Sequence, residues 1–148
     1  MTGAVRKKNQ PGRRAWARRC AAQALYQWQM TGQDPSQIAA QFLADEDLHK
    51  ADPDYFRELV HQVPAHAAEL DAALEPFLDR PLAQVDPVEH AILRIGGYEL
   101  LHHPELAYRI VINEAVELAK IFGAEQGHRF VNGMLDRLAR TARPAEFT

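Results

Sequence analysis

The sequence predicts an all-α protein with about seven helices. Proline directly follows aspartate at residues 34–35, 52–53 and 86–87. An aspartate caps the start of a helix, and the proline after it suits the first turn because its missing N–H would lack a partner there. Between these pairs, apolar residues recur every three or four positions, and the alternation typical of strands does not occur. These observations favour a helical bundle.

The predicted helices follow one another with short connections. They cover residues 13–30, 36–44, 54–63, 65–79, 87–102, 108–122 and 127–140. The first ends at Thr31-Gly32, since glycine adopts the left-handed cap conformation, and Gly123 ends the sixth. The second, third and fifth each begin at one of the Asp-Pro pairs. Pro76 should kink the last turn of the fourth helix.

Two adjacent glycines interrupt the fifth helix. Gly96 and Gly97 lie in its middle, where each glycine costs about 1 kcal/mol relative to alanine. We therefore expect another helix to approach closely at this point. The apolar faces of the sixth and seventh helices are formed by Ile112, Val116 and Ala119 and by Val131, Leu135 and Leu138.

The composition predicts one soluble, cytoplasmic domain. With 148 residues, 47% of them hydrophobic and 25% charged, the chain is long enough for one core and too short for two. No apolar run approaches the roughly 18–20 residues needed to cross a bilayer. The single cysteine, Cys20, excludes an internal disulfide and a cysteine-based zinc cluster. We expect a flexible basic N-terminal extension at residues 1–12, a helical domain at 13–140 and a C-terminal tail at 141–148.

Charge is distributed unevenly along the chain. Seven basic residues and no acidic residue precede Asp34, whereas the remainder carries ten basic and twenty acidic residues. A basic arm on an acidic body is typical of a protein that binds a polyanion. A solvated basic tail without a partner is the alternative.

The first predicted helix has an apolar and a basic face when its residues are placed 100° apart. The core face is formed by Ala17, Cys20, Ala21, Ala24, Leu25 and Trp28. Arg19, Gln23 and Tyr26 lie on the opposite side, and Arg18 flanks them. Cations beside an aromatic ring are typical of single-stranded nucleic-acid binding, because guanidinium groups pair with phosphates while the ring stacks on a base. Alternatively, Tyr26 packs against a neighbouring helix with its hydroxyl at the surface.

Four Glu-x-x-His pairs raise the alternative of a metalloenzyme. They are Glu46/His49, Glu58/His61, Glu99/His102 and Glu125/His128. Di-metal bundles use two such pairs pointing inward, but only Glu99 lies on an apolar face, and Glu58 and His61 are expected to face solvent. An arginine or a helix N-terminus should keep a buried Glu99 charged. With no phosphate loop or nucleophile motif present, we expect no metal site, no cofactor and no catalytic residue.

Segments spread over most of the chain match one family in order and spacing. They are ARRCAAQALYQW at residues 17–28, VEHAILRI at 88–95, YEL at 98–100, INEAVELAK at 112–120, FGA at 122–124, FVNG at 130–133 and LD at 135–136. From about residue 13 to 138, the sequence resembles the NusB family of bacterial transcription antitermination factors. The resemblance implies a fold of two small perpendicular helical bundles.

The resemblance also implies partners and site residues. In this family the protein pairs with NusE, a ribosomal small-subunit protein, binds single-stranded boxA RNA, and joins an RNA-polymerase complex that resists termination on ribosomal RNA operons. The residues that match RNA-binding positions of the family are Arg13, Arg14, Arg18, Arg19, Tyr26, Arg129 and Phe130. Glu89 matches an acidic residue on the surface that faces NusE.

Four positions depart from the family pattern. Arg19 replaces a residue that is often acidic, Gly127 stands where a serine cap is common, and residues 96–97 are smaller than expected.

Two other interpretations of the function remain. First, the helical domain also resembles the N-terminal RNA-binding part of a ribosomal RNA cytosine methyltransferase. That enzyme needs a Rossmann-type domain, and the 148 residues of this sequence include no glycine-rich cofactor loop. The second is a protein adaptor that uses the acidic body.

Overall fold

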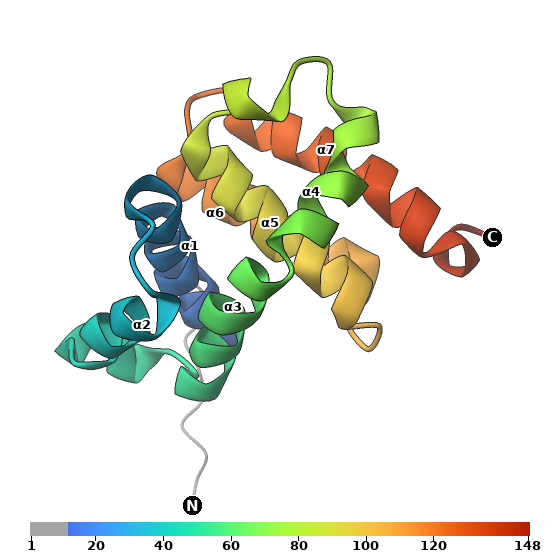
Figure 1. The fold of residues 1–148 in the computed structure, drawn as a ribbon. Helices are drawn as coiled ribbons and strands as arrows, with labels where there is room; N and C mark the ends of the chain where they lie inside the picture. The colour runs from blue at the N-terminus through green and yellow to red at the C-terminus, as the bar shows by residue number, and fades with distance from the viewer. Residues whose placement is uncertain (1–11) are drawn as a thin grey trace, which may run out of the picture.

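The computed structural model describes residues 12–148, except for the side chains of residues 46 and 47. This part of the chain contains seven α-helices and no strand, which confirms the predicted all-α fold (Figure 1). The helices are α1 (Arg13–Thr31), α2 (Pro35–Leu43), α3 (Pro53–Ala65), α4 (Ala67–Leu74), α5 (Pro87–His102), α6 (Tyr108–Phe122) and α7 (Gly127–Ala142). Four 3₁₀ turns, η1 to η4, lie at Glu46–Lys50, Glu75–Phe77, Leu82–Gln84 and Pro144–Phe147. The predicted flexible extension lies outside the described residues, except for Gly12.

The three Asp-Pro pairs start helices as predicted. Asp34 accepts a hydrogen bond from the backbone N–H of Ser36 at 2.9 Å, and Asp52 and Asp86 each accept two such bonds at the starts of α3 and α5. Gly32 ends α1 in the left-handed conformation, with a φ of 70°. Gly123 ends α6 in an extended conformation instead.

The fourth predicted helix is shorter than expected. α4 ends at Leu74, and Pro76 belongs to the separate turn η2, because proline supplies no N–H to continue the helical ladder. The preceding helix is longer than expected: α3 continues through Pro64 to Ala65. The two helices meet at His66, which ends α3 and precedes α4.

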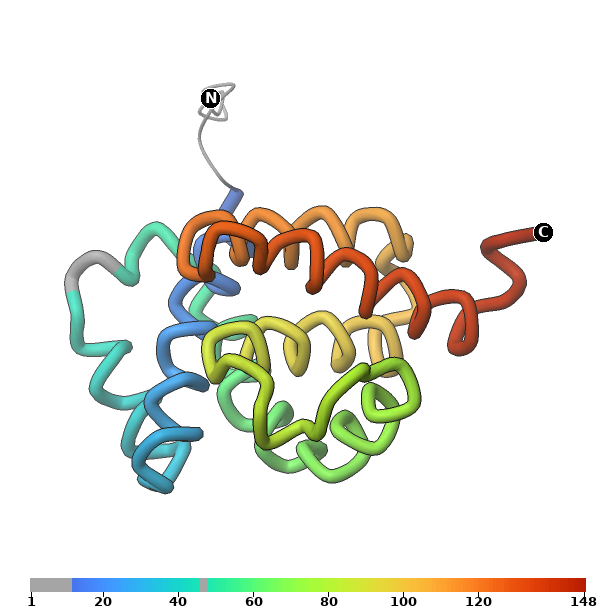
Figure 2. Tube along the Cα trace, turned by 90° about the horizontal axis from the view of Figure 1, so that it is seen from above, coloured from blue at the N-terminus to red at the C-terminus, as the bar shows by residue number. Residues whose placement is uncertain are grey.

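The helices form two groups. Helices α1, α2 and α3 pack against one another, and α5 packs against α4, α6 and α7. Figure 2 shows α5, α6 and α7 lying along one another, with α1 running crosswise to them. This arrangement is the pair of perpendicular bundles that the family resemblance implies. Contacts between α1 and α5 join the two groups.

The glycine pair of α5 permits the close approach of α7. A Cβ on Gly96 would lie 2.6 Å from Cδ1 of Leu135, which is shorter than real contacts allow. A Cβ on Gly97 would meet Leu138 and Leu70 at 3.7 Å, an ordinary contact. The close approach predicted from the sequence therefore occurs at Gly96.

The chain remains folded beyond the expected boundary at residue 140. α7 extends to Ala142, and the buried guanidinium of Arg143 donates to backbone carbonyls of Glu99, Leu100 and His103 at 2.8–3.0 Å. In η4, Phe147 packs on the ring of Tyr108 with 4.3 Å between ring centroids. None of the helices in this part of the chain is long and apolar enough to span a membrane.

Candidate nucleic-acid interface

Tyr26 is exposed on α1, beside an apolar groove. Its side chain is 39% exposed, as the helical wheel predicts, and it lies on the same face as the exposed Met30. The groove has a volume of about 480 Å³, and Val88 of α5 and Phe122 of α6 form part of its wall. An aromatic ring at the edge of an apolar groove offers an unstacked base both a stacking partner and a place to be buried.

Arg19 lies seven residues before Tyr26 and also faces α6. Its guanidinium lies over the ring of Trp16, 4.7 Å from the centroid. Arg19 and Lys120 line a second groove of about 410 Å³, together with Ile121. Glu114 and Glu117 also line this groove, and Glu117 pairs with Lys120 at 3.7 Å. The cations of this groove therefore come from α1 and from the end of α6, and they share it with two carboxylates.

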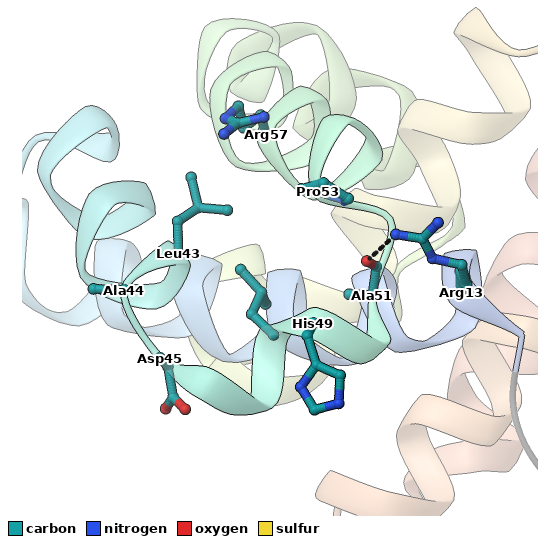
Figure 3. A pocket seen from close by; sticks show the side chains of 9 residues that line it. Arg13, Leu43, Ala44, Asp45, His49, Ala51, Pro53 and Arg57 are labelled. Carbon is teal, nitrogen blue, oxygen red and sulfur yellow. Dashed lines mark hydrogen bonds between the residues drawn. The ribbon is translucent and has the colours of Figure 1, made fainter.

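Arg13 and Arg14 are exposed but point toward α3 rather than α6. Arg13 donates to the backbone carbonyl of Ala51 at 3.1 Å and lines a pocket between η1 and α3 (Figure 3). The guanidinium of Arg14 lies 4.2 Å from the ring centroid of Tyr55. The basic residues of α1 thus surround its first turns instead of forming one stripe.

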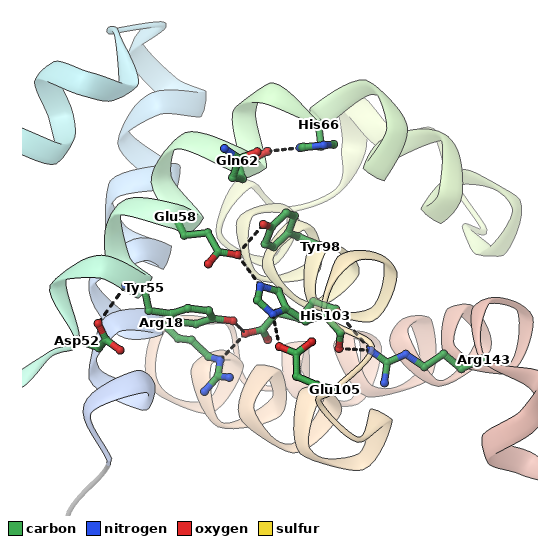
Figure 4. A network of polar contacts seen from close by, with 11 residues as sticks. Arg18, Asp52, Tyr55, Glu58, Gln62, His66, Tyr98, His103, Glu105 and Arg143 are labelled. Atoms are coloured by element: carbon green, nitrogen blue, oxygen red, sulfur yellow. Dashed lines mark hydrogen bonds and ion pairs between the residues drawn. The ribbon is translucent and has the colours of Figure 1, made fainter.

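The structure corrects the prediction for Arg18. Its side chain is buried, with only 4% of the residue exposed, and its Nε donates to Glu99 at 2.8 Å (Figure 4). Glu114 pairs with the same guanidinium at 3.4 Å. Arg18 is held by two carboxylates in the core, so it is not available to bind a phosphate.

Glu99 is the buried carboxylate that the sequence analysis singled out. It is 1% exposed and accepts hydrogen bonds from Arg18 and from the hydroxyl of Tyr55. Burial and the charge of Glu99 raise the pKa of Tyr55, so its hydroxyl stays protonated and donates. The prediction that an arginine pairs with a buried Glu99 is confirmed.

The prediction that Glu58 faces solvent is wrong. Its carboxylate is half-buried and accepts hydrogen bonds from the Tyr98 hydroxyl at 2.6 Å and from His103 at 2.5 Å (Figure 4). The wheel placed Glu58 away from the core of its own helix, but α5 covers that side of α3. Burial opposes ionisation of Glu58, but the bonds from Tyr98 and His103 outweigh it and lower its pKa.

Arg129 and Phe130 lie at the start of α7. Arg129 is exposed, whereas Phe130 is half-buried and packs against the core. The exposed guanidinium of Arg80 lies over the Phe130 ring, 4.6 Å from its centroid. Arg80 precedes α5 in a segment without periodicity, so no sequence signal connected it to Phe130.

Glu89 is largely buried between α5 and α7. It is 8% exposed, and a Cβ on Gly127 would lie 2.6 Å from its Oε2. Burial and the charge of Asp86 raise the pKa of Glu89. Gly127 therefore gives the Glu89 side chain the room that a serine would occupy, which accounts for one departure from the family pattern. This position leaves little of the Glu89 side chain for a partner to contact.

Comparison with known proteins identifies the family. A model of the NusB family matches residues 16–140. The chain belongs to the NusB family. A relative from Nitrosococcus oceani, named transcription antitermination protein NusB, is 56% identical over 135 residues, which are 91% of this chain and 90% of the relative. A protein of the same name from Idiomarina loihiensis is 52% identical and covers 90% of this chain and 96% of its own length.

Two solved NusB structures share the fold. NusB of T. maritima superposes with a TM-score of 0.79 at 28% identity, covering 93% of this chain and 97% of that one. NusB from a crystal structure of the antitermination factors NusB and NusE in complex with double-stranded RNA gives 0.75 at 26% identity, covering 86% and 96%. The fold implied by the motifs is therefore the NusB fold.

Within this NusB fold, the predicted site residues fall into separate groups. Arg19 and Tyr26 lie along the contact between α1 and the end of α6, whereas Arg13 and Arg14 lie on the side of α3. Lys120 was not predicted as a site residue. The apolar periodicity of α6 shows which face of the helix is buried, but it does not show that Lys120 lies near α1.

Proposed function

We propose that this chain is a transcription antitermination factor that binds RNA and pairs with NusE. Its membership of the NusB family supports this function, as do the names of its relatives and the NusB–NusE–RNA complex among its structural neighbours. It is a binding protein rather than an enzyme and acts in the cytoplasm, where the RNA-polymerase antitermination complex assembles on nascent RNA.

The observation that carries the proposal is the exposed ring of Tyr26 in the wall of an apolar groove, on the same helix as Arg19. The apolar groove can bury a base, and Arg19 and Lys120, which line a second groove, can meet phosphates. Base stacking and phosphate pairing are the two contributions that binding to an RNA strand requires. We include Arg129 and Phe130 at the start of α7, where Arg80 lies over the Phe130 ring, as further proposed RNA contacts.

The ligand we propose is a single-stranded, boxA-type segment. A tyrosine ring stacks on a base whose faces are free, and in a duplex both faces are occupied by neighbouring bases. The related complex contains double-stranded RNA, so the two forms of RNA should be compared directly.

Glu89 remains our proposed contact to NusE. Glu89 is 8% exposed, and Arg80 is close enough to stabilise its charge. NusE would approach the start of α5, where Glu89 follows Val88, a residue of the Tyr26 groove.

The test is a titration of fluorescent RNA with the purified chain, with and without NusE. A boxA-like single strand of about twelve nucleotides is compared with the same sequence in a duplex and with a scrambled single strand. We expect tighter binding of the boxA strand than of either control, and a further gain when NusE is present. Equal binding of the three RNAs, unaffected by NusE, would contradict the proposed function.

A further inference from the structure

A group of histidine and carboxylate side chains lies at the other end of α5. His66 occupies the bend between α3 and α4, Glu69 lies in the first turn of α4, and His102 is the last residue of α5. Val88, beside the Tyr26 groove, is about 20 Å away along α5, at 1.5 Å per residue. The group is therefore separate from the proposed RNA-binding surface.

The three side chains bring their ligand atoms together. One nitrogen of each imidazole and one oxygen of Glu69 all lie within 4.8 Å of one another. His102 Nε2 is 2.6 Å from Glu69 Oε1, and the ring centroids of His66 and His102 are 4.5 Å apart. Ligands of a tetrahedral Zn²⁺ ion, at about 2.0–2.1 Å from the metal, lie about 3.4 Å from one another. The side chains of Glu69 and His102 are exposed and therefore have room to rotate toward that spacing.

Neighbouring groups already orient both histidines. Nδ1 of His66 is 2.9 Å from the backbone carbonyl of Gln62 (Figure 4), and because a carbonyl only accepts, Nδ1 carries the proton. In the neutral imidazole the lone pair of His66 is then on Nε2, as in a metal-binding histidine whose other nitrogen donates to the backbone. The ring of Tyr98 stacks on His102 with 5.2 Å between centroids and an interplanar angle of 26°.

The local charge favours a cation. The carbonyl end of α3, which carries partial negative charge, lies at this group, since α3 ends at Ala65. The carbonyls at the end of α5 already accept hydrogen bonds from the guanidinium of Arg143. The start of α4 contributes partial positive charge, and Glu69 in its first turn offsets it. A bound divalent ion would therefore be stabilised by the carboxylate of Glu69 and by the end of α3.

We propose that His66, Glu69 and His102 bind one Zn²⁺ ion, with a water molecule in the fourth position. Two neutral imidazoles and one carboxylate bind Zn²⁺ in preference to Mg²⁺ or Ca²⁺, because those two ions select oxygen ligands. The exposure of Glu69 and His102 leaves room for the water. The ion would fasten the bend between α3 and α4 to the end of α5, so that binding stabilises the folded chain.

The sequence analysis rejected the four Glu-x-x-His pairs as a metal site, and the structure gives no reason to restore them as a set. The proposed site arises from the opposite order, His66-x-x-Glu69, joined by His102 from a helix distant in sequence. Only the packing of α4 against α5 brings the third ligand to the other two.

The experiment uses the full chain without a polyhistidine tag and ZnCl₂ as the probe. Calorimetric titration gives stoichiometry and affinity, and the melting temperature is measured with and without the ion. We expect one ion per chain and a higher melting temperature with zinc. The variants His66→Gln, Glu69→Gln and His102→Gln should each lose about tenfold or more in affinity. His61→Gln, a histidine on α3 outside the group, is the matched control and should bind as the parent does.

Three results would overturn the proposal. The first is the absence of saturable binding at micromolar zinc in the parent chain. The second is equal affinity in the parent and in Glu69→Gln and His102→Gln. The third is a loss of affinity in the His61→Gln control as large as that in the variants of the group. Glu69 and His102 are exposed, so these variants keep the fold, and circular dichroism checks that they do.

Discussion

Two consecutive arginines of α1 have different environments. Arg18 lies in the core, where Glu99 and Glu114 hold its guanidinium, whereas Arg19 lies at the surface over Trp16. Consecutive residues of a helix point about 100° apart, so a change of one position moves an arginine from the core to a groove. Arg18 therefore joins the two bundles, and Arg19 is the residue that can pair with a phosphate.

The two arginines should respond differently to substitution. Arg18→Met should lower the free energy of unfolding by about 3–5 kcal/mol, because it leaves the charge of Glu99 buried without its guanidinium. Arg19→Met should change that free energy by less than about 1 kcal/mol and weaken RNA binding, with a smaller loss at high salt. Urea unfolding gives the free energy of unfolding of both variants, and RNA titration at low and high salt gives their affinities. An Arg19 variant as unstable as the Arg18 variant would show that both residues belong to the core.

Glu89 should make stability depend on pH. Burial and Asp86 raise its pKa, so the folded state holds its proton more tightly than the unfolded state does. The cost of ionising Glu89 in the fold is absent at pH values below the ordinary pKa of about 4.3 and develops as pH rises through the raised pKa. Glu89→Gln should therefore melt above the parent chain at pH 8 and together with it near pH 3.5. Identical melting at both pH values would show that the buried charge carries no cost.

At the scale of helices, the sequence predicted where helices start, because helix caps depend on neighbouring residues. It did not predict side-chain environments that depend on residues distant in the sequence. The caps at Asp34, Asp52 and Asp86 depend on residues two or three positions away, and all three occur where the sequence places them. The environment of Glu58 depends on Tyr98 and His103, which are at least forty positions away. A helical wheel reports the faces of one helix, but it does not report which of them another helix covers.

The glycine pair of α5 gives a prediction about helix packing. Gly96→Ala should destabilise the fold by about 1–3 kcal/mol, because its Cβ would meet the fully buried Leu135 at 2.6 Å. Gly97→Ala has room for its Cβ and should stabilise the fold by up to about 1 kcal/mol through helix propensity. Thermal unfolding of the two variants, measured side by side, decides this. Equal stability would mean that α7 moves away freely and that the close approach is not needed.

At the scale of the whole molecule, the candidate interface depends on how α1 packs on the second bundle. The exposure of Tyr26 and the position of Arg19 were predicted from α1 alone. Lys120, Phe122 and Arg80 become part of the surface only because α6 and the segment before α5 fold next to α1 and α7. The sequence therefore supplied candidate residues on α1 and at the start of α7, and the structure was needed to find their neighbours on α6 and before α5.

The central claim is that Tyr26 stacks on an RNA base, and one titration tests it most directly. Single-stranded boxA-like RNA is titrated with the parent chain, Tyr26→Ala and the control Tyr26→Phe at low and high salt. Loss of the ring in Tyr26→Ala should weaken the free energy of RNA binding by about 1–3 kcal/mol. The affinity should fall by the same factor at both salt concentrations, because stacking releases no counterions. Tyr26→Phe keeps the ring and should bind normally, and all three chains should melt together. Normal RNA binding by a Tyr26→Ala variant that melts several degrees lower would contradict the account, because Tyr26 would then be a packing residue.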